Sequence, residues 1–279
     1  MLLSLLILAG AACRPEPPAP AKADPESRRS LPAGEVVGST GRYGAHVWLG
    51  IPYAKPPVGA LRWRAPEPRE AWNGVREALA PPAVCAQLPS RFGGVESDDP
   101  EKPVGGEDCL YLNVYAPRFS PGEVPKAGSR LPVLFWIHGG GNVIGHASFY
   151  DGGNLAATHR VVVVALNYRL GPLGWFRHEA LRAEAGSADD RSGNYGTLDL
   201  VRGLEWVREN VAGFGGDPGN VTIFGESAGG RNVFSLLLSP KARGLFHRAI
   251  VQSGGTGTAP VETAETLADA TPPGHRNSS

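Results

Sequence analysis

The chain has 279 residues, with 27 basic against 27 acidic side chains and a formal net charge of zero. This balance excludes a strongly basic surface, so we expect neither nucleic acid nor an anionic membrane as an electrostatic partner. Three cysteines are too few for a disulfide-rich miniprotein or a zinc site made of cysteines alone, and 42% hydrophobic residues exclude disorder along the whole chain.

The chain begins with twelve uncharged residues, most of them Leu, Ile or Ala. This run is shorter than the roughly 20 apolar residues that span a bilayer, and we interpret residues 1–13 as an export signal. The sequence LAGAAC at residues 8–13 is similar to a bacterial lipoprotein cleavage site, although Leu8 lies farther from Cys13 than that pattern requires. Three destinations stay open: the periplasm, the outer membrane through a lipid on Cys13, and secretion.

A proline-rich segment follows at residues 14–33. It has no apolar stripe to bury, and its prolines favour extended backbone, so we interpret it as a linker. From residue 34 to residue 279 we expect one α/β domain.

Four apolar runs in this domain are typical of strands that are buried on both faces of a parallel sheet. They lie at residues 131–137, 161–166, 221–224 and 249–252. Apolar residues from Leu198 to Val211 recur every three or four positions, which predicts a helix that ends at the glycines after residue 212. A second helix is expected over residues 227–238. The alternation of strands and helices predicts a mostly parallel sheet with helices on both faces.

The sequence Gly225-Glu226-Ser227-Ala228-Gly229 lies between the run at 221–224 and the second helix. This G-x-S-x-G pattern, in a strand–turn–helix context, is typical of a nucleophile elbow. The turn is so tight that the residues two before and two after the serine have to be small, as Gly225 and Gly229 are. It lifts the Ser227 hydroxyl to the N-terminus of a helix, where developing negative charge is favoured.

A second motif, His138-Gly139-Gly140-Gly141, directly follows the run at 131–137. We interpret it as part of an oxyanion hole whose donors are the N–H groups of Gly140, Gly141 and Ala228. A plain glycine turn is the alternative interpretation. A phosphate-binding loop is not supported, because these residues fail G-x-G-x-x-G and the chain contains no G-x-x-x-x-G-K-[ST]. The two motifs together indicate ester hydrolysis.

Longer motifs extend this interpretation along the chain. They are GIPYAKPPVGALRWRAPEP (50–68), EDCLYLNVYAP (107–117), FWIHGGGN (135–142), NYRLGPLGW (167–175), GNYGTLDLVRGLEWVRENVAGFGGDPGNVTIFGESAGG (193–230) and FHRAIVQSG (246–254). With these motifs, the chain resembles a type B carboxylesterase, of the cholinesterase-like branch of the α/β-hydrolases, over about residues 35–260.

The resemblance implies an α/β-hydrolase fold, a small-molecule ester as substrate, Ser227 as nucleophile, and neither a cofactor nor a metal. It also implies that Glu226 is a buried anion near the catalytic imidazole, and that Cys85 and Cys109 form a disulfide. Such a bridge fits an exported protein.

The chain departs from the resemblance at three positions near the expected site. Asn142 stands where an aromatic residue usually follows the glycines, and Leu200 and Asn232 replace a usual Gln and a usual small Ser. We expect the first two to alter the acyl or alcohol pocket. The segment between Cys85 and Cys109 holds Phe92 but no tryptophan to stack a quaternary ammonium, which favours uncharged short-chain or aryl esters over choline esters.

The triad of this fold runs Ser, then Asp or Glu, then His along the chain. Only 52 residues follow Ser227, and each further strand–helix–strand unit needs about 30, so they cannot hold both partners. We expect the C-terminal half of the fold, with the acid and the histidine, on a complementing segment outside this chain. Of the histidines present, we expect His138 to be structural, His247 to lie at the opposite sheet edge, and His275 to lie in a polar tail.

A second function class stays open. The chain could be a truncated, catalytically inactive interaction module similar to cholinesterases. The retained Ser227 argues against this, because such modules usually lose the serine.

Overall fold

The computed structural model describes residues 20–258 and residue 260. Its main element is a sheet in the order β10-β9-β7-β8-β6-β4-β3. The strands are β3 (Ser39–Thr40), β4 (His46–Pro52), β6 (Tyr111–Ala116), β7 (Leu131–Ile137), β8 (Val162–Leu166), β9 (Gly216–Glu226) and β10 (Arg248–Gln252). The neighbours from β10 to β8 are parallel, and those from β8 to β3 are antiparallel. A smaller sheet pairs β1 (Arg29–Leu31), β2 (Gly34–Val37) and β5 (Val75–Glu77).

The apolar runs form strands as predicted. β7 covers residues 131–137, and all five residues of β8 are buried, as expected for a strand covered on both faces. β9 is longer than its apolar run, because residues 216–220 also pair with the start of β7 around an irregularity in register. The predicted helices are α4 (Tyr195–Asn210) and α5 (Ala228–Leu238).

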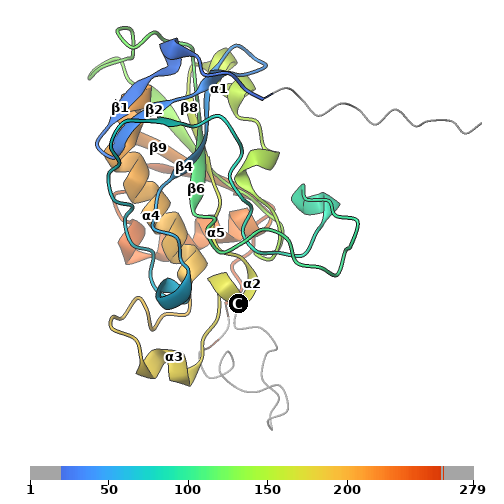
Figure 1. The fold of residues 1–279 in the computed structure, drawn as a ribbon. Coiled ribbons are helices and arrows are strands. Elements are labelled where there is room, and N and C mark those ends of the chain that lie inside the picture. Colours follow the sequence, from blue (N-terminus) through green and yellow to red (C-terminus); the bar gives the residue numbers. More distant parts are fainter. Residues whose placement is uncertain (1–19, 259, 261–279) are drawn as a thin grey trace, which may run out of the picture.

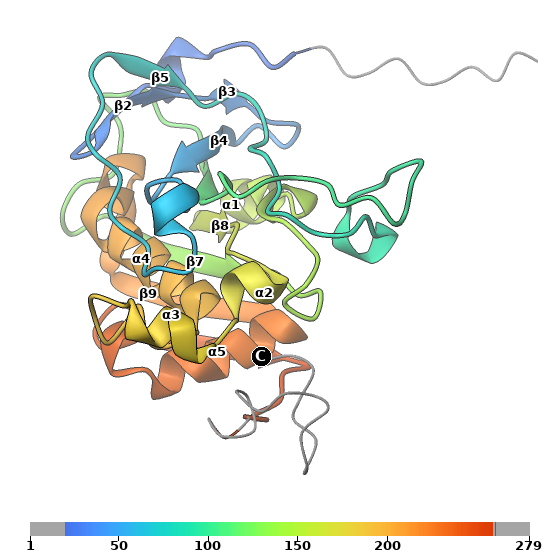
Figure 2. The same cartoon turned by 60° about the horizontal axis from the view of Figure 1, so that its bottom comes forward.

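Helices cover the two faces of the sheet unequally (Figures 1 and 2). Phe135 and Ile137 of β7 point into the main core with α4 and α5, while Trp136 points to the other face. On that other face α1 (Gly153–His159) packs on β6 and β8. The remaining helices are the short α2 (Gly171–Gly174) and α3 (Glu179–Ala183). Short 3₁₀ turns lie at Pro25–Ser27, Gly59–Leu61, Arg91–Gly93, Ala147–Phe149, Val211–Phe214 and Pro240–Ala242.

The predicted linker is wrong over its second half. Residues 24–31 form a 3₁₀ turn and β1, and Ser27, Arg29 and Leu31 are buried. Sequence reasoning missed this because the segment carries polar side chains rather than an apolar stripe. The ordered domain therefore begins before residue 34.

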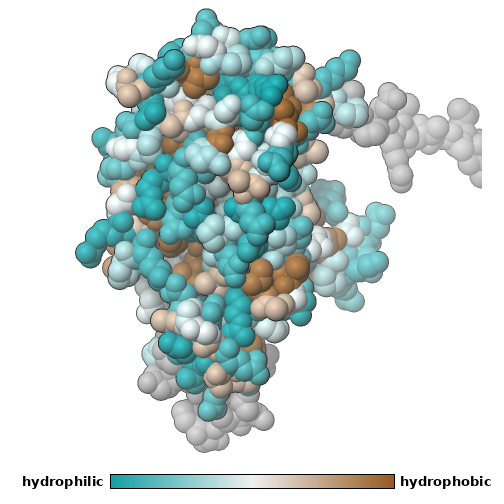
Figure 3. All heavy atoms as spheres, turned by 60° about the vertical axis from the view of Figure 1, so that its left-hand side comes forward, coloured by the Kyte–Doolittle hydropathy of each residue, from teal (hydrophilic) through white to brown (hydrophobic). Residues whose placement is uncertain are grey.

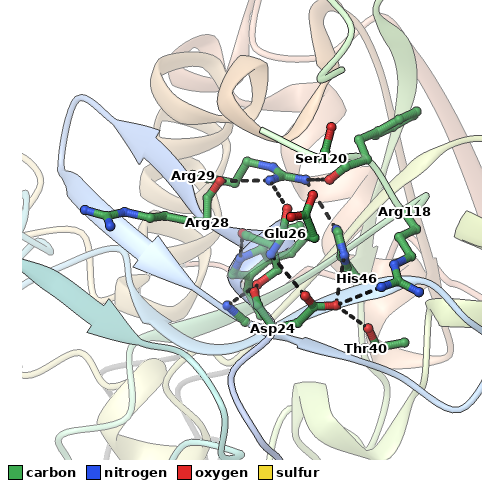
Figure 4. A network of polar contacts seen from close by, with 12 residues as sticks. Asp24, Glu26, Arg28, Arg29, Thr40, His46, Arg118 and Ser120 are labelled. Atoms are coloured by element: carbon green, nitrogen blue, oxygen red, sulfur yellow. Dashed lines mark hydrogen bonds and ion pairs between the residues drawn. The ribbon is translucent and has the colours of Figure 1, made fainter. Parts of the chain in front are cut away.

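Charged side chains hold this segment in place (Figure 4). Asp24 Oδ2 accepts a hydrogen bond from the Thr40 hydroxyl at 2.6 Å and lies 3.4 Å from His46 Nε2. The Thr40 hydrogen bond is the main cause that lowers the Asp24 pKa. The Arg29 guanidinium donates to the Phe119 carbonyl at 2.8 Å, which ties β1 to the segment after β6.

The disulfide between Cys85 and Cys109 is present, as the resemblance implied. It closes a loop that extends from the body of the molecule (Figure 2). Phe92, within this loop, is 93% exposed. The export signal and Cys13 lie outside the described residues.

The outer surface is mainly polar on the side that carries β1, β2 and α4. Figure 3 shows this side with apolar side chains gathered in a few small patches. In the described part of the chain, no helix has both the length and the apolar character required to cross a membrane.

Candidate active site

Ser227 occupies a strained turn between β9 and α5. Its backbone has φ of 55° and ψ of −117°, a conformation that a non-glycine residue adopts only when its surroundings enforce it. The Ser227 N–H donates to the Gln252 carbonyl at 2.9 Å, and the Ser227 carbonyl accepts from the Arg231 N–H at 3.0 Å. The side chain is exposed, as a nucleophile elbow requires.

The glycines on either side of Ser227 are required by close backbone contacts. A Cβ at Gly225 would lie 2.6 Å from the Gly229 backbone and 2.8 Å from the Ile137 carbonyl oxygen. A Cβ at Gly229 would overlap the same Ile137 oxygen. The elbow therefore packs directly on the end of β7, where the glycine loop begins.

The glycine loop lies against Ser227. A Cβ at Gly139 would be 3.3 Å from the Ser227 Cβ, so the two backbones are adjacent. Gly140 and Gly141 have φ of 97° and 65°, a region that favours glycine. Asn142 continues the turn with φ of 61°, which asparagine tolerates better than most residues.

Backbone N–H groups without acceptors gather beside Ser227. Among residues 20–258 and 260, the N–H groups of Gly140 and Gly141 donate to no acceptor. Ala228 is the first residue of α5, so its N–H has no partner within the helix. An unpaired N–H at a helix N-terminus, with two more on the adjacent glycine loop, favours an anion or a developing oxyanion there.

Side chains clamp both ends of the glycine loop. The Tyr168 hydroxyl donates to the His138 carbonyl at 2.6 Å, at the start of the loop. At its end, the Asn142 carbonyl accepts from the Gly171 N–H at 2.7 Å, and Asn142 Oδ1 accepts from Asn232 Nδ2 at 2.9 Å. Two of the three departures noted in the sequence are thus partners of each other.

The remaining departure, Leu200, does not line the site. It is fully buried in the core between the sheet and α4, so the expectation that it shapes a substrate pocket is not supported.

The segment that supports the loop is fixed by a buried ion pair that sequence reasoning did not identify. Arg169 donates to Asp199 of α4 through Nε at 2.8 Å and Nη2 at 2.7 Å, and the Arg169 backbone N–H also donates to this carboxylate at 3.0 Å. Both side chains are nearly inaccessible to solvent. In the sequence, Arg169 lies within the NYRLGPLGW motif (167–175), but this motif assigned no role to any single residue.

Glu226 is exposed, which corrects the prediction that it is a buried anion. Its side chain shares the sheet face of Phe224, two residues earlier. The helix on that face, α1, packs on β6 and β8 and leaves this end of β9 open. Glu226 does lie near Tyr150: burial is the main cause that raises the Tyr150 pKa, and the Glu226 charge adds to it.

His138 is a packed side chain, as predicted. Its ring is buried, stacks on Tyr168 with ring centroids 4.3 Å apart, and bonds the Gly139 carbonyl through Nδ1 at 2.9 Å. Burial lowers the His138 pKa to about 4, so the ring is neutral at pH 7.

No histidine of the described residues is hydrogen bonded to Ser227. His247 lies at the start of β10, where Nδ1 accepts from the Val221 N–H at 3.1 Å, at the far end of the strand from the elbow. His275 lies outside the described residues. Within the described ranges, no group of three or more His, Cys, Asp or Glu side chains is arranged to hold a metal ion.

Comparison with known proteins points to one family. The model of the carboxylesterase family matches residues 27–271. The chain is 50% identical over 217 residues to the cocaine esterase of Oryctolagus cuniculus, covering 75% of this chain and 38% of that protein. It is 49% identical over 233 residues to the para-nitrobenzyl esterase of Bacillus subtilis (strain 168), covering 83% of this chain and 44% of that protein.

Solved structures agree with the sequence comparison. A PNB esterase superposes with a TM-score of 0.72 at 44% sequence identity, covering 85% of this chain and 46% of that chain. A thermophilic PNB esterase superposes with a TM-score of 0.73 at 45% identity. The chain spans about two fifths of the length of the curated relatives that it matches.

Proposed function

The chain belongs to the carboxylesterase family and has the α/β-hydrolase fold, and from this we propose that it carries the nucleophile and the oxyanion hole of a serine carboxylic-ester hydrolase. One observation carries the proposal. Ser227 is exposed on a strained turn, in backbone contact with a loop whose Gly140 and Gly141 N–H groups are unpaired. The Ala228 N–H at the start of α5 completes three donors around one serine.

The proposed reaction follows from this geometry. Ser227 Oγ attacks the ester carbonyl carbon, and the negative charge that develops on the carbonyl oxygen is bound by the three N–H groups. The alcohol then leaves, and an acyl group remains on Ser227. Water attacks the acyl carbon and releases the carboxylic acid.

The hydroxyl needs a base to be an efficient nucleophile. Since no histidine of the described residues contacts Ser227, we assign the histidine and the acid to polypeptide outside those residues. In the proposed complete site, the histidine takes the Ser227 proton and the acid orients its ring.

One face of the sheet has an open groove on which such polypeptide would pack. On the face opposite α4 and α5, a groove of about 390 Å³ is lined by aromatic and apolar side chains, among them Trp136, Tyr150, Leu155 and Phe224. Ile250 lies opposite Phe224 in the register and is 48% exposed. Sheets of this class normally carry helices on both faces, so we propose that the complementing segment covers this groove.

We propose uncharged short-chain or aryl esters as substrates. The segment between Cys85 and Cys109 contains no tryptophan to stack a quaternary ammonium, and its Phe92 points to solvent. The relatives named above include a para-nitrobenzyl esterase and a cocaine esterase.

We also propose export, directed by residues 1–13, to the periplasm, to the outer membrane through a lipid on Cys13, or to the medium. The Cys85–Cys109 disulfide supports this, because disulfides persist in oxidising compartments.

The proposal is tested with p-nitrophenyl acetate. We compare the chain alone with a fusion that adds the part of the Bacillus subtilis para-nitrobenzyl esterase that this chain does not match. The chain alone should accelerate hydrolysis by no more than roughly 10³- to 10⁴-fold over water, the level left by an oxyanion hole without a triad. The fusion should exceed this by at least about 100-fold.

Ser227→Ala is the control, and it should reduce the fusion to the residual level of the chain alone. High turnover by the chain alone, abolished by Ser227→Ala, would contradict the assignment of the base outside the described residues. Turnover of the fusion that does not depend on Ser227 would contradict the hydrolase itself and favour the non-catalytic interaction module.

A further inference from the structure

We infer that Asn232 is a positioning residue for the oxyanion hole: its side-chain amide holds Asn142, and through Asn142 it fixes the Gly140 and Gly141 N–H groups relative to Ser227. This inference rests on the function proposed above, and extends it to a side chain that does not contact the reacting atoms. The observation behind it is the hydrogen bond from Asn232 Nδ2 to Asn142 Oδ1, 2.9 Å long.

The bond joins the two parts of the site. Asn232 lies in α5, the helix that starts directly after Ser227, while Asn142 directly follows the donor glycines. Both side chains are buried, 2% exposed for Asn232 and 7% for Asn142. Among the described residues, this is the side-chain hydrogen bond that connects the glycine loop with the nucleophile helix.

The loop needs such a bond because its own backbone restrains it weakly. Gly140 and Gly141 lack a Cβ and have wide conformational freedom. Within the loop, the Gly140 carbonyl accepts from the Val143 N–H at 3.1 Å and from the Ile144 N–H at 3.0 Å. These bonds shape the turn, but they do not set its distance from Ser227.

The other hydrogen-bonded anchors of the loop come from elements other than α5. The Tyr168 hydroxyl holds the His138 carbonyl, and the Gly171 N–H holds the Asn142 carbonyl, and both come from the segment after β8. Asn232 also lies beside the Tyr168 hydroxyl. Backbone packing of Gly229 holds the start of the loop against the elbow, and Asn232 is the side chain through which the nucleophile helix holds its far end, at Asn142.

The test compares Asn232→Ala with Asn210→Ala in the same chain. Asn210 is a matched control, because it is also a helical asparagine, is also 2% exposed, and also donates one side-chain hydrogen bond, to the Trp206 carbonyl, away from the loop. The first readout is hydrogen exchange at the Val143 and Ile144 amides, which does not depend on catalysis. We expect about 10-fold faster exchange in Asn232→Ala and unchanged exchange at these amides in Asn210→Ala.

The second readout is the rate at which a small fluorophosphonate labels Ser227, measured in the fusion described above because it supplies the base. We expect the maximal labelling rate to fall roughly 10- to 100-fold in Asn232→Ala, because displaced donors no longer meet the phosphoryl oxygen. The concentration for half-maximal rate should stay constant. A loss of folded protein alone would instead reduce the amount labelled and leave the rate constant of the folded fraction unchanged.

A second variant tests the same hydrogen bond from the other side, so that the inference stays testable if Asn232→Ala does not fold. Asn142→Gly removes the partner side chain and keeps the left-handed backbone, and it should show the same two effects. The double variant should be no slower than either single variant, since both remove one interaction.

The outcomes separate this inference from the proposed function. Normal exchange and normal labelling in both variants would overturn the positioning role. An absence of Ser227 labelling in the fusion without these substitutions, which supplies the base, would overturn the proposed function and with it the catalytic meaning of the role. Hydrogen exchange would then still decide whether Asn232 holds the loop.

Discussion

Ser227 combines two residue-level properties that are rarely found together: a strained backbone and an exposed hydroxyl. The strain persists because β7, β9 and α5 pack closely around the turn. A Cβ at position 225 or 229 would be too close to the neighbouring backbone, so both positions require glycine. Strain of this kind, held by the fold, keeps the hydroxyl in one position before any substrate binds.

The close approach at Gly229 predicts a large effect of one added methyl group. In Gly229→Ala the Cβ would overlap the Ile137 carbonyl oxygen, which belongs to a central strand and cannot move freely. We expect the free energy of unfolding to fall by about 3 kcal/mol or more. Urea denaturation of this variant measures the loss.

Gly122→Ala is the matched control, because nothing lies within 4 Å of the Cβ it would add. We expect a change within about 0.5 kcal/mol for this variant. Equal stability of the two variants would contradict the tight packing of the elbow on β7.

His138 predicts a pH dependence of stability. Burial lowers its pKa to about 4 in the folded chain, against about 6.5 when unfolded, so the unfolded state binds the proton more readily. The neutral ring contributes its full stability above pH 6.5, and this contribution is lost as the pH falls toward 4. Between pH 7 and pH 4.5 the loss should be roughly 2 kcal/mol.

The measurement compares unfolding free energies at these two pH values in the parent chain and in His138→Gln. The variant should lose roughly 2 kcal/mol less than the parent chain over this interval. His159→Gln, at an exposed histidine at the end of α1, should behave like the parent. If His138→Gln and the parent showed the same pH dependence, a buried neutral His138 would be ruled out.

Sequence reasoning identified the residues of the site whose positions follow from local motifs. The elbow around Ser227 and the turn at Gly140 and Gly141 each lie at the end of an apolar strand, and strand ends at one sheet edge meet. The contact between Asn142 and Asn232 could not be predicted, because it joins residues 90 positions apart through side-chain geometry. The exposure of Glu226 depends on what covers the sheet, which no local motif encodes.

At the level of elements, the strands that are buried on both faces were the most predictable. Continuous apolar sequence leaves few alternatives for β7 and β8, and three- or four-residue spacing defines α4. β9 starts earlier than predicted because GDPGN, at its beginning, has the composition of a turn. The same limitation explains the linker error: β1 is held by Arg29, Asp24 and their partners and not by an apolar stripe.

The Cys85–Cys109 bridge gives an element-level prediction. It closes a loop between residues separated by 24 positions, and closing such a loop should stabilise the folded chain by roughly 3 kcal/mol through the entropy of the unfolded state. Guanidinium denaturation with and without a thiol reductant measures this difference.

A double variant, Cys85→Ala with Cys109→Ala, isolates the bridge. It should be less stable than the oxidised parent by a similar amount and should not respond to reductant. A parent chain whose stability is the same in reductant would show that the loop is held by its other contacts, such as the hydrogen bonds between Gln87 and Val104.

At the scale of the whole molecule, the sheet is covered well on the side of α4 and α5 and incompletely on the side of α1 (Figure 2). The groove lined by Trp136, Tyr150 and Phe224 lies on the incompletely covered side, which is also the side of Glu226. The chain spans about two fifths of the length of its curated relatives. We propose that one complementing segment supplies the base, the acid and the cover for this groove.

We propose that Ser227 and its neighbouring N–H groups form a site for acyl transfer. The most direct measurement is mass-spectrometric mapping of the fusion with the para-nitrobenzyl esterase segment, which supplies the base, after reaction with a fluorophosphonate. We predict an adduct on the peptide that contains Ser227, formed faster than on any other serine of the chain and lost in Ser227→Ala. Labelling spread over several serines without preference, or confined to a serine other than Ser227, would contradict it.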